Sequence, residues 1–399
     1  MLHVKVQLTR TKTIDINFPF RGGSKSHAEM SGVELFPADG ATCPAVHISR
    51  KKGVWHLLAA DRIPGPAGEL PERWEDISRQ PSWSLPREFQ SPHAALAVNS
   101  IQGSFGQASA EAIVQEMMHG PAAAEAVEPA KPAAGGSRLK LKRAEAAPAP
   151  KPAAPEPQTP ARRPELPAAG RAASENGRRF TLRPFGEEGF HLCASLPEYQ
   201  ALWTSRLLPE GRRPTASSIQ LAESALMASL LAQPEFLEDK GTALAVFVRG
   251  DKIYFAGYRS GTPVLWRECP SVRGEKAMRE TVKRKLGVDD ELIDSVLDDA
   301  LIDPRPALEP FVHPILEQLE LSRAYLAGKH SMKIERVFLM GLSAGAGQWN
   351  RLAEESLHLS LLAPDPFAGF ACAKGVEVSR PQDYLVALGA ALAAMEVEA

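Results

Sequence analysis

The first hundred residues show a pattern of apolar and polar positions that predicts strands. Two runs near the start, HVKVQLTR and TIDINFPF, alternate with a period of two and suit a hairpin. Runs of similar strand-like character follow: GVELF (32–36), PAVHIS (44–49), VWHLLAADRI (54–63) and AALAVN (94–99). At 109–118 the spacing of apolar residues changes to that of a helix. This part of the chain is therefore predicted to be mostly sheet.

After residue 178 strands and helices interleave. RRFTLRPF and FHLCASL suggest a strand pair, and TALAVFVR, KIYFAGYR and PVLWREC suggest a three-stranded antiparallel meander because only short turns join them. Helical patterns lie around these strands: PEYQALWTSRLL, LAESALMASLLAQ, GEKAMRETVKRKLG, DDELIDSVLDDAL, PILEQLELSRAYLAG and PQDYLVALGAALAAM. Such interleaving predicts an α/β chain with a mixed sheet.

A long segment between these two parts has a different composition. Residues 121–178 hold 11 of the 34 prolines, with many alanines and no aromatic residue. A segment of this kind cannot bury enough apolar surface to offset the entropy of ordering the chain. We therefore predict a disordered linker over 119–178.

Composition and charge exclude several classes of protein. A net charge of −2 over 399 residues offers no basis for binding nucleic acid. The four cysteines lie far apart without a CxxC pair, which argues against a structural zinc site and for free thiols in a reducing compartment. The first residues lack the apolar core of a signal peptide, and the apolar run at 385–395 is too short to span a bilayer. We expect a cytoplasmic protein.

The stretch ERVFLMGLSAGAGQWNRLAEES (335–356) contains the pattern G-x-S-x-G at Gly341–Gly345, which is typical of a serine hydrolase. That mechanism requires an acid and then a histidine later in the chain. The only later histidine is His358, no acidic residue at a later strand end lies between Ser343 and His358, and 56 residues are too few for the missing strands. The glycine spacing also fits neither a Rossmann nor a Walker loop. A strand, a glycine turn and a helix could instead approach a nucleotide.

The order of motifs at the C-terminal end resembles that of PilM-like proteins of type IV pilus and type II secretion machines, which belong to the actin-like superfamily. The matching features are GLSAGAG, the Pro366-Phe367 pair and a small-residue helix in which Tyr384, Ala387, Gly389 and Ala391 fit the family pattern. The resemblance continues backward through Leu319, Ser322 and Tyr325, although Gln318 stands where a glutamate is usual. Residues 242–270 and 32–63 resemble the two phosphate hairpins of that fold.

The resemblance implies a two-lobed actin-like α/β fold with a small inserted subdomain and the long disordered linker. The expected division is as follows: an N-terminal extension with a possible hairpin (1–30), the first part of lobe I (31–118), the linker (119–178), the rest of lobe I with the inserted subdomain (179–240), and lobe II with a C-terminal helix that returns to lobe I (241–399).

The hairpins depart from the family in ways that bear on nucleotide binding. Phe36 and Pro37 replace the small residues of the first hairpin, and Val246–Arg249 lacks the acid of the second, where Gly250-Asp251 forms the turn. Residual nucleotide contacts are therefore expected only from Gly341, Ser343, Gly345 and Gly347, with Asp39, Gly40 and Thr42 as a further candidate phosphate turn. No cofactor is expected to be required, although ATP with magnesium remains an alternative. No metal site and no catalytic residue are expected.

Two other groups of residues have competing interpretations. His47 and His56 alternate with apolar residues on paired strands, which favours a role in the sheet over metal binding. Trp74 and Trp83 lie in a proline-bounded loop, where each could be a core anchor or an exposed binding residue.

Family members act as cytoplasmic adaptors, so the resemblance implies that this chain binds the cytoplasmic tail of a single-span inner-membrane protein of a pilus or secretion assembly. It would be peripheral to the membrane through that partner, without a direct span and without ATP hydrolysis. The alternative is an active actin-like ATPase that drives or gates the assembly. A metabolite kinase on the same fold would need phosphate loops and a base that are missing here.

Overall fold

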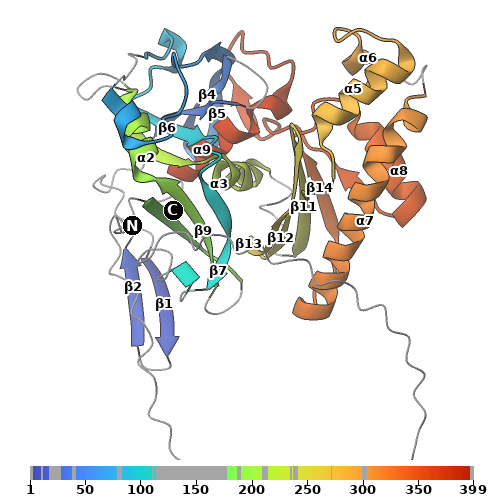
Figure 1. Cartoon of the computed structure of the whole chain (residues 1–399), viewed down its shortest axis with the longest axis horizontal. Helices are drawn as coiled ribbons and strands as arrows, with labels where there is room; N and C mark the ends of the chain where they lie inside the picture. The colour runs from blue at the N-terminus through green and yellow to red at the C-terminus, as the bar shows by residue number, and fades with distance from the viewer. Residues whose placement is uncertain are drawn as a thin grey trace, which may run out of the picture.

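A computed structural model of the protein describes residues 3–9, 12–17, 28–37, 42–78, 83–109, 112–113, 178–186, 190–208, 214–233, 236, 241–270, 272–298 and 303–395. These residues form two lobes that lie side by side (Figure 1). The predicted linker at 119–178 and the cluster Asp39-Gly40 fall almost wholly outside the described residues; only Arg178 of this set is included.

Lobe I is built on a six-stranded mixed sheet with the order β10-β6-β3-β4-β5-β16. Its strands are β3 (Glu29–Leu35), β4 (Thr42–Lys51), β5 (Val54–Pro64), β6 (His93–Val98), β10 (Thr215–Leu221) and β16 (Phe370–Cys372). The strands β3, β4 and β5 form an antiparallel meander, while β6 and β10 run parallel to β3. The short β16 pairs with β5, so the chain re-enters lobe I before its last helix.

Both faces of this sheet are covered, which explains why its central strands are apolar at nearly every position. In β6, Ala95 and Ala97 belong to the core shared with α3 (Ala222–Ala228) and α9 (Leu385–Met395). Leu96 and Val98 belong to the core on the opposite face, which includes Trp203 of α2 (Glu198–Arg206). The small residues of α9 allow this helix to pack closely against the sheet of lobe I and against α3.

The inserted subdomain is a three-stranded antiparallel sheet with the order β7-β9-β8. It consists of β7 (Ser104–Ser109), β8 (Arg178–Pro184) and β9 (Phe190–Pro197), and β8 with β9 is the strand pair expected from the sequence. Near the N-terminus β1 (His3–Thr9) and β2 (Lys12–Asn17) pair antiparallel as a separate two-stranded sheet.

Lobe II contains the predicted meander, continued by two parallel strands, in the order β13-β12-β11-β14-β15. The strands are β11 (Thr242–Arg249), β12 (Lys252–Arg259), β13 (Thr262–Glu268), β14 (Arg336–Met340) and β15 (Leu361–Leu362). The helices α5 (Glu275–Leu286), α6 (Ile293–Asp298), α7 (Arg305–His330) and α8 (Ala346–Leu357) lie on the side of the sheet away from lobe I (Figure 1). The other side packs on α3, with Phe247, Trp266 and Phe338 in one core with lobe I.

The helix α7 is longer than expected. It begins at Arg305 and contains Pro310 and Pro314, whereas the predicted helix began at Pro314. Proline normally interrupts a helix, since it has no N–H to donate to the carbonyl four residues earlier. The carbonyl of Pro306, left without its partner by Pro310, accepts a hydrogen bond from Lys285 Nζ at 3.1 Å. A side chain from α5 thus helps α7 to tolerate the proline.

The short 3-10 helices η1 (Trp74–Ser78), η2 (Arg87–Phe89), η3 (Ser229–Ala232) and η4 (Pro381–Tyr384) complete the regular structure. Trp83 is a core anchor whose indole donates to the Pro64 carbonyl at 2.9 Å, whereas Trp74 is 52% exposed. His47 is buried and bonded to Glu29 and to the Glu88 carbonyl, which confirms a structural role. Within the described ranges, no helix is both long and apolar enough to cross a membrane.

Candidate functional site: the cleft between the lobes

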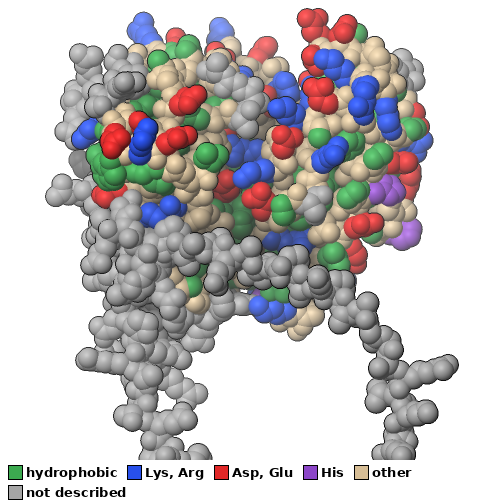
Figure 2. All heavy atoms as spheres, in the orientation of Figure 1, with side chains coloured by type: hydrophobic (Ala, Val, Ile, Leu, Met, Phe, Trp, Pro, Cys, Tyr) green, Lys and Arg blue, Asp and Glu red, His purple; other side chains and the backbone are tan. Residues whose placement is uncertain are grey.

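A cleft of about 440 Å³ opens between the two lobes, where charged side chains of both signs gather (Figure 2). Its lining comes from the ends of β3, β5 and β11, from α5, from the glycine turn after β14 and from η4. Five basic and six acidic side chains line it: Arg62, Arg249, Lys276, Arg279 and Arg380, with Glu34, Asp251, Glu275, Glu280, Asp290 and Asp383. The lining therefore has no excess of positive charge with which to attract a phosphate chain.

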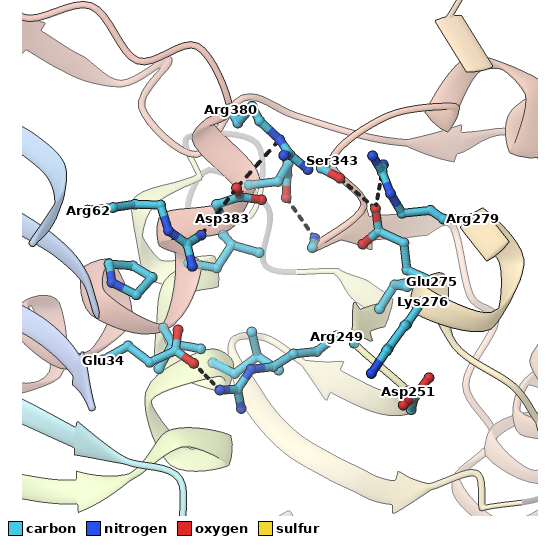
Figure 3. A pocket seen from close by; sticks show the side chains of 18 of the residues that line it. Glu34, Arg62, Arg249, Asp251, Glu275, Lys276, Arg279, Ser343, Arg380 and Asp383 are labelled. Carbon is cyan, nitrogen blue, oxygen red and sulfur yellow. Dashed lines mark hydrogen bonds and ion pairs between the residues drawn. The ribbon is translucent and has the colours of Figure 1, made fainter. Parts of the chain in front are cut away.

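The two predicted phosphate hairpins face each other across this cleft and are joined by an ion pair. Arg249, the last residue of β11, donates from Nη2 to Glu34 Oε1 on β3 (Figure 3). It also donates to Asn99 Oδ1. Asn99 also donates to Glu34 Oε1 at 2.9 Å and to the Leu35 carbonyl at 3.1 Å, which holds the carboxylate in place. Arg249 and Glu34 are only 19% and 6% exposed, so the pair is largely removed from water.

The electrostatics of Arg249 keep it charged. Burial on its own lowers the pKa of a guanidinium, but the carboxylates of Glu34 and Glu223 outweigh burial and raise the pKa of Arg249. Glu223 lies on α3 and accepts a hydrogen bond from the Tyr254 hydroxyl of β12 at 3.2 Å. Lobe II thus reaches lobe I through two neighbouring polar contacts above the shared apolar core.

The glycine turn uses its backbone donors within the protein itself. The Gly341 N–H donates to Gln382 Oε1 at 2.7 Å, and the Gly345 N–H donates to Asp298 Oδ1 at 2.8 Å. Both glycines have positive φ, 83° and 82°, which side-chain-bearing residues rarely adopt. A Cβ on Gly341 would lie 2.1 Å from the Val248 carbonyl oxygen, so packing against β11 already requires glycine there. The turn is therefore explained without a bound ligand.

Ser343 has a carboxylate, not a histidine, as its hydrogen-bond partner. Its hydroxyl donates to Glu275 Oε1 at 2.5 Å, and Glu275 also pairs with Arg279 at 3.5 Å (Figure 3). His358, the only histidine after Ser343, lies beyond the far end of α8, roughly 18 Å of helix away. The hydroxyl of Ser343 is thus held by a carboxylate, and His358 is too distant to form a Ser-His pair with it.

A second series of ion pairs crosses the cleft at η4. Asp383 pairs with Arg62 of β5 at 3.6 Å and with Arg380 at 3.5 Å, and Arg380 reaches Asp294 of α6 at 3.8 Å. Asp294 is in turn the partner of Arg279 on α5. Lobe I, η4 and the helices of lobe II are thus connected through alternating charges.

The residues predicted to contact nucleotide are only partly brought together. Gly341 and Ser343 line the cleft, whereas Gly347 lies in α8 and Gly345 caps that helix. Thr42 begins β4 and accepts a hydrogen bond from Arg62 Nε at 3.1 Å. Asp39 and Gly40 lie outside the described residues. A nucleotide-binding role for these residues remains a prediction.

Glu34, Asn99 and Gln382 were not predicted to belong to the site, because their roles depend on contacts between distant segments. Arg249 was predicted only as a position without the acid of the family. One signal for this contact was available in the sequence. One hairpin strand ends near a basic residue and the other ends near an acidic residue. Among the described residues, no group of three or more His, Cys, Asp or Glu side chains is placed to hold a metal ion.

Glu275 provides a test of the site by pH. Burial raises its pKa above the usual 4.5, against smaller opposing effects of Ser343 and Arg279. The folded state therefore binds this proton more tightly than the unfolded state, so ionised Glu275 lowers stability at neutral pH. We expect Glu275→Gln to raise the melting temperature at about pH 7.5, with the gain shrinking as the pH falls toward about 4.5.

Thermal melts across this pH range check the expectation. The exposed Glu291 provides the matched control, because Glu291→Gln should leave the melting temperature unchanged. A lower melting temperature for Glu275→Gln at neutral pH would show that the hydrogen bond and ion pair of Glu275 outweigh its burial.

The fold is actin-like. Two lobes surround a cleft, each lobe contributes a strand hairpin, and a helix near the C-terminal end packs on lobe I. No family model matches the chain, and no curated protein sequence matches it.

Among solved structures, the PilM-PilN type IV pilus biogenesis complex is similar over nearly the whole length: the TM-score is 0.55 at 17% identity, covering 93% of this chain and 99% of that one. The resemblance to PilM-like proteins is thus confirmed at the level of the fold.

Two further structures are similar with TM-scores too low to support inference. One is a Bacteroides thetaiotaomicron protein with actin-like ATPase fold and unknown function (TM-score 0.37, 6% identity, 86% of this chain and 95% of that one). The other is the cytoplasmic domain of EpsL, an inner-membrane component of the type II secretion system of Vibrio cholerae (TM-score 0.29, 11% identity, 60% of this chain and 69% of that one).

Proposed function

We propose that this protein is a cytoplasmic actin-like adaptor that binds the cytoplasmic tail of a single-span inner-membrane protein in a pilus or secretion assembly, without hydrolysing ATP. The fold of the PilM-PilN complex, in which a chain of this architecture is found with a partner, supports the adaptor role. The contacts among protein side chains within the cleft support the absence of ATP hydrolysis.

The ion pair between Glu34 and Arg249 is the observation that carries the second part of the proposal. It joins the hairpin strands at the place where the fold would need donors for phosphate oxygens and ligands for magnesium. The backbone donors of Gly341 and Gly345 are also engaged by protein side chains. A triphosphate would have to displace these contacts and would meet no net positive charge in return.

We expect no magnesium-dependent ATP hydrolysis above background and a dissociation constant for ATP of roughly a millimolar. Calorimetry with ATP and magnesium, together with a phosphate-release assay, measures both quantities. The control is the same titration without magnesium, which should give the same weak binding.

An active ATPase is the second candidate, because the volume of the cleft falls within the range of small-molecule sites. Micromolar, magnesium-dependent binding with turnover would establish that candidate and refute our proposal. The two candidates therefore differ in one direct measurement.

Two exposed apolar side chains mark a surface of lobe I suited to a peptide. Trp74 is 52% exposed with its ring 6.0 Å from that of Tyr199, and Ile101 is 96% exposed. The two loops are joined, since Gln102 next to Ile101 donates to the Glu72 carbonyl at 3.3 Å. Exposed aromatic and aliphatic side chains of this kind are frequent anchors in protein interfaces.

The charge around Trp74 indicates the kind of peptide. Residues 69–76 carry four acidic side chains and one basic one: Glu69, Glu72, Glu75 and Asp76, with Arg73. Cytoplasmic segments next to a membrane span are enriched in lysine and arginine. We therefore assign a basic tail with an apolar anchor to this surface, with peptide recognition through the side chains of Trp74 and Ile101.

Binding of a synthetic tail peptide tests this assignment. The peptide is taken from a single-span membrane protein encoded beside this chain, and its affinity is measured by fluorescence anisotropy. Trp74→Ala should weaken binding about 30-fold, the effect of losing a central aromatic anchor. Leu321→Ala, at a 57% exposed leucine on α7 of lobe II, is the matched control and should bind normally. Equal affinity of the Trp74 variant and the parent protein would remove this surface from the proposal.

A further inference from the structure

We infer that Arg249 and Glu34, together with Asn99, form an interlobe clasp that holds the cleft of this protein closed in the absence of any nucleotide. In a two-lobed fold the bound ligand can be the bridge between the lobes. Here the protein provides a bridge from its own side chains, so the relative orientation of the two lobes is fixed without a ligand. The inference concerns the isolated protein and does not depend on the proposed partner.

The position of Arg249 on β11 is the first support. Ala245 and Phe247 precede it at spacings of two and face the apolar core shared by the lobes. Successive side chains of a strand alternate between faces, so Arg249 continues the face of β11 that is turned toward lobe I. The clasp therefore lies directly beyond the end of the apolar interface, where Arg249 and Glu34 line the cleft.

The environment of the clasp makes separation of its partners costly. Arg249 and Glu34 are 19% and 6% exposed, and the second carboxylate near Arg249 is that of Glu223. Charges in such surroundings interact more strongly than charges in water, and salt screens them less. A hinge motion that moves Arg249 away from Glu34 would leave the buried Glu34 carboxylate without its ionic partner.

Asn99 gives the clasp its geometry. It donates from Nδ2 to Glu34 at 2.9 Å and accepts from Arg249 with Oδ1, so one amide contacts both partners. If the side-chain amide of Asn99 rotates by half a turn, its oxygen and its NH2 group exchange places. The same position can therefore serve a pair in which the two charges are exchanged, which makes a charge-swap experiment meaningful.

The distance between the lobes in the full chain provides the measurement. Cys372 on β16 of lobe I is exposed, whereas Cys43, Cys193 and Cys269 are buried. Arg284→Cys adds one exposed label site on α5 of lobe II. Spin labels at these two positions give a distance distribution for the parent protein without nucleotide, which we expect to be narrow.

Breaking the clasp should change this distribution. We expect Arg249→Glu and the milder Arg249→Gln each to lengthen the mean distance by several ångströms or to broaden its distribution. The charge-swapped protein combines Glu34→Arg and Arg249→Glu with Glu223→Gln, because the Glu223 carboxylate next to position 249 would otherwise repel the new glutamate. It should restore the narrow parent distribution. Arg305→Glu, which breaks an exposed ion pair within lobe II, is the matched control and should leave the distribution unchanged.

Circular dichroism confirms beforehand that each variant is folded, and hydrogen exchange of the Gly341 amide gives a second measure. That amide is bonded to Gln382 across the cleft and should exchange faster when the clasp is broken. Parent-like distances and exchange in folded Arg249→Gln would overturn the inference. A charge-swapped protein that remains as open as the single variants would also overturn it.

Discussion

Gly389→Ala is expected to be among the most destabilising single substitutions in this protein, with a loss of about 3 to 5 kcal/mol in the free energy of unfolding. A Cβ at Gly389 of α9 would lie 1.8 Å from the Ala225 carbonyl oxygen and 2.9 Å from the Ser229 nitrogen. Both atoms are backbone, so no side-chain rotation can relieve the overlap. α9 would have to move away from α3, and the core of lobe I would lose its packing.

Gly347→Ala is the matched control for this prediction. Gly347 lies in α8, and a Cβ there would meet nothing within 4 Å. Alanine is a better helix former than glycine, so this variant should gain about 0.5 to 1 kcal/mol. Denaturant melts of both variants measure the two free energies. A loss of similar size for both would show that the close approach of α9 to α3 is not what distinguishes the two positions.

Arg249→Ala is expected to have the second large effect, with a loss of about 3 to 5 kcal/mol. The variant leaves the Glu34 carboxylate, 6% exposed, without its ionic partner. A double-mutant cycle with Glu34→Ala isolates the coupling, because the double variant removes both buried charges. We expect the double variant to be more stable than the sum of the single losses indicates.

Arg305→Ala is the control for this cycle. Arg305 pairs with Asp303 and Glu355 at the surface, where solvent screens the interaction, and its loss should leave the unfolding midpoint unchanged. Strict additivity of the Arg249 and Glu34 variants would contradict the interpretation of the pair as a coupled, buried contact.

The sequence predicted the elements that local periodicity determines. The meander β11–β13 was visible because alternating apolar residues and two short turns leave one simple way to pair the strands. The apolar α9 was visible because it consists of small and aliphatic residues on all sides, as its burial requires. The two-lobed fold was predicted from the family resemblance, which rests on the order of these elements along the chain.

The parts that depend on contacts between distant segments could not be predicted. Glu34 and Arg249 are 215 positions apart, and neither shows in its own segment that it meets the other. The length of α7 was underestimated because the partner that relieves Pro310, Lys285, lies on another helix. The site was predicted from its glycines, whereas the geometry that defines it comes from the charged side chains opposite them.

The late return of the chain to lobe I has a consequence for folding during synthesis. The strands of lobe II all lie between residues 242 and 362, so this lobe can complete its sheet as soon as that segment leaves the ribosome. Lobe I contains β3 from the first part of the chain but needs β16 and α9, which are synthesised after the strands of lobe II. The part of the apolar face that α9 covers must therefore wait until residues 370–395 have been synthesised. During this interval the nascent chain presents a target for chaperones and a risk of aggregation.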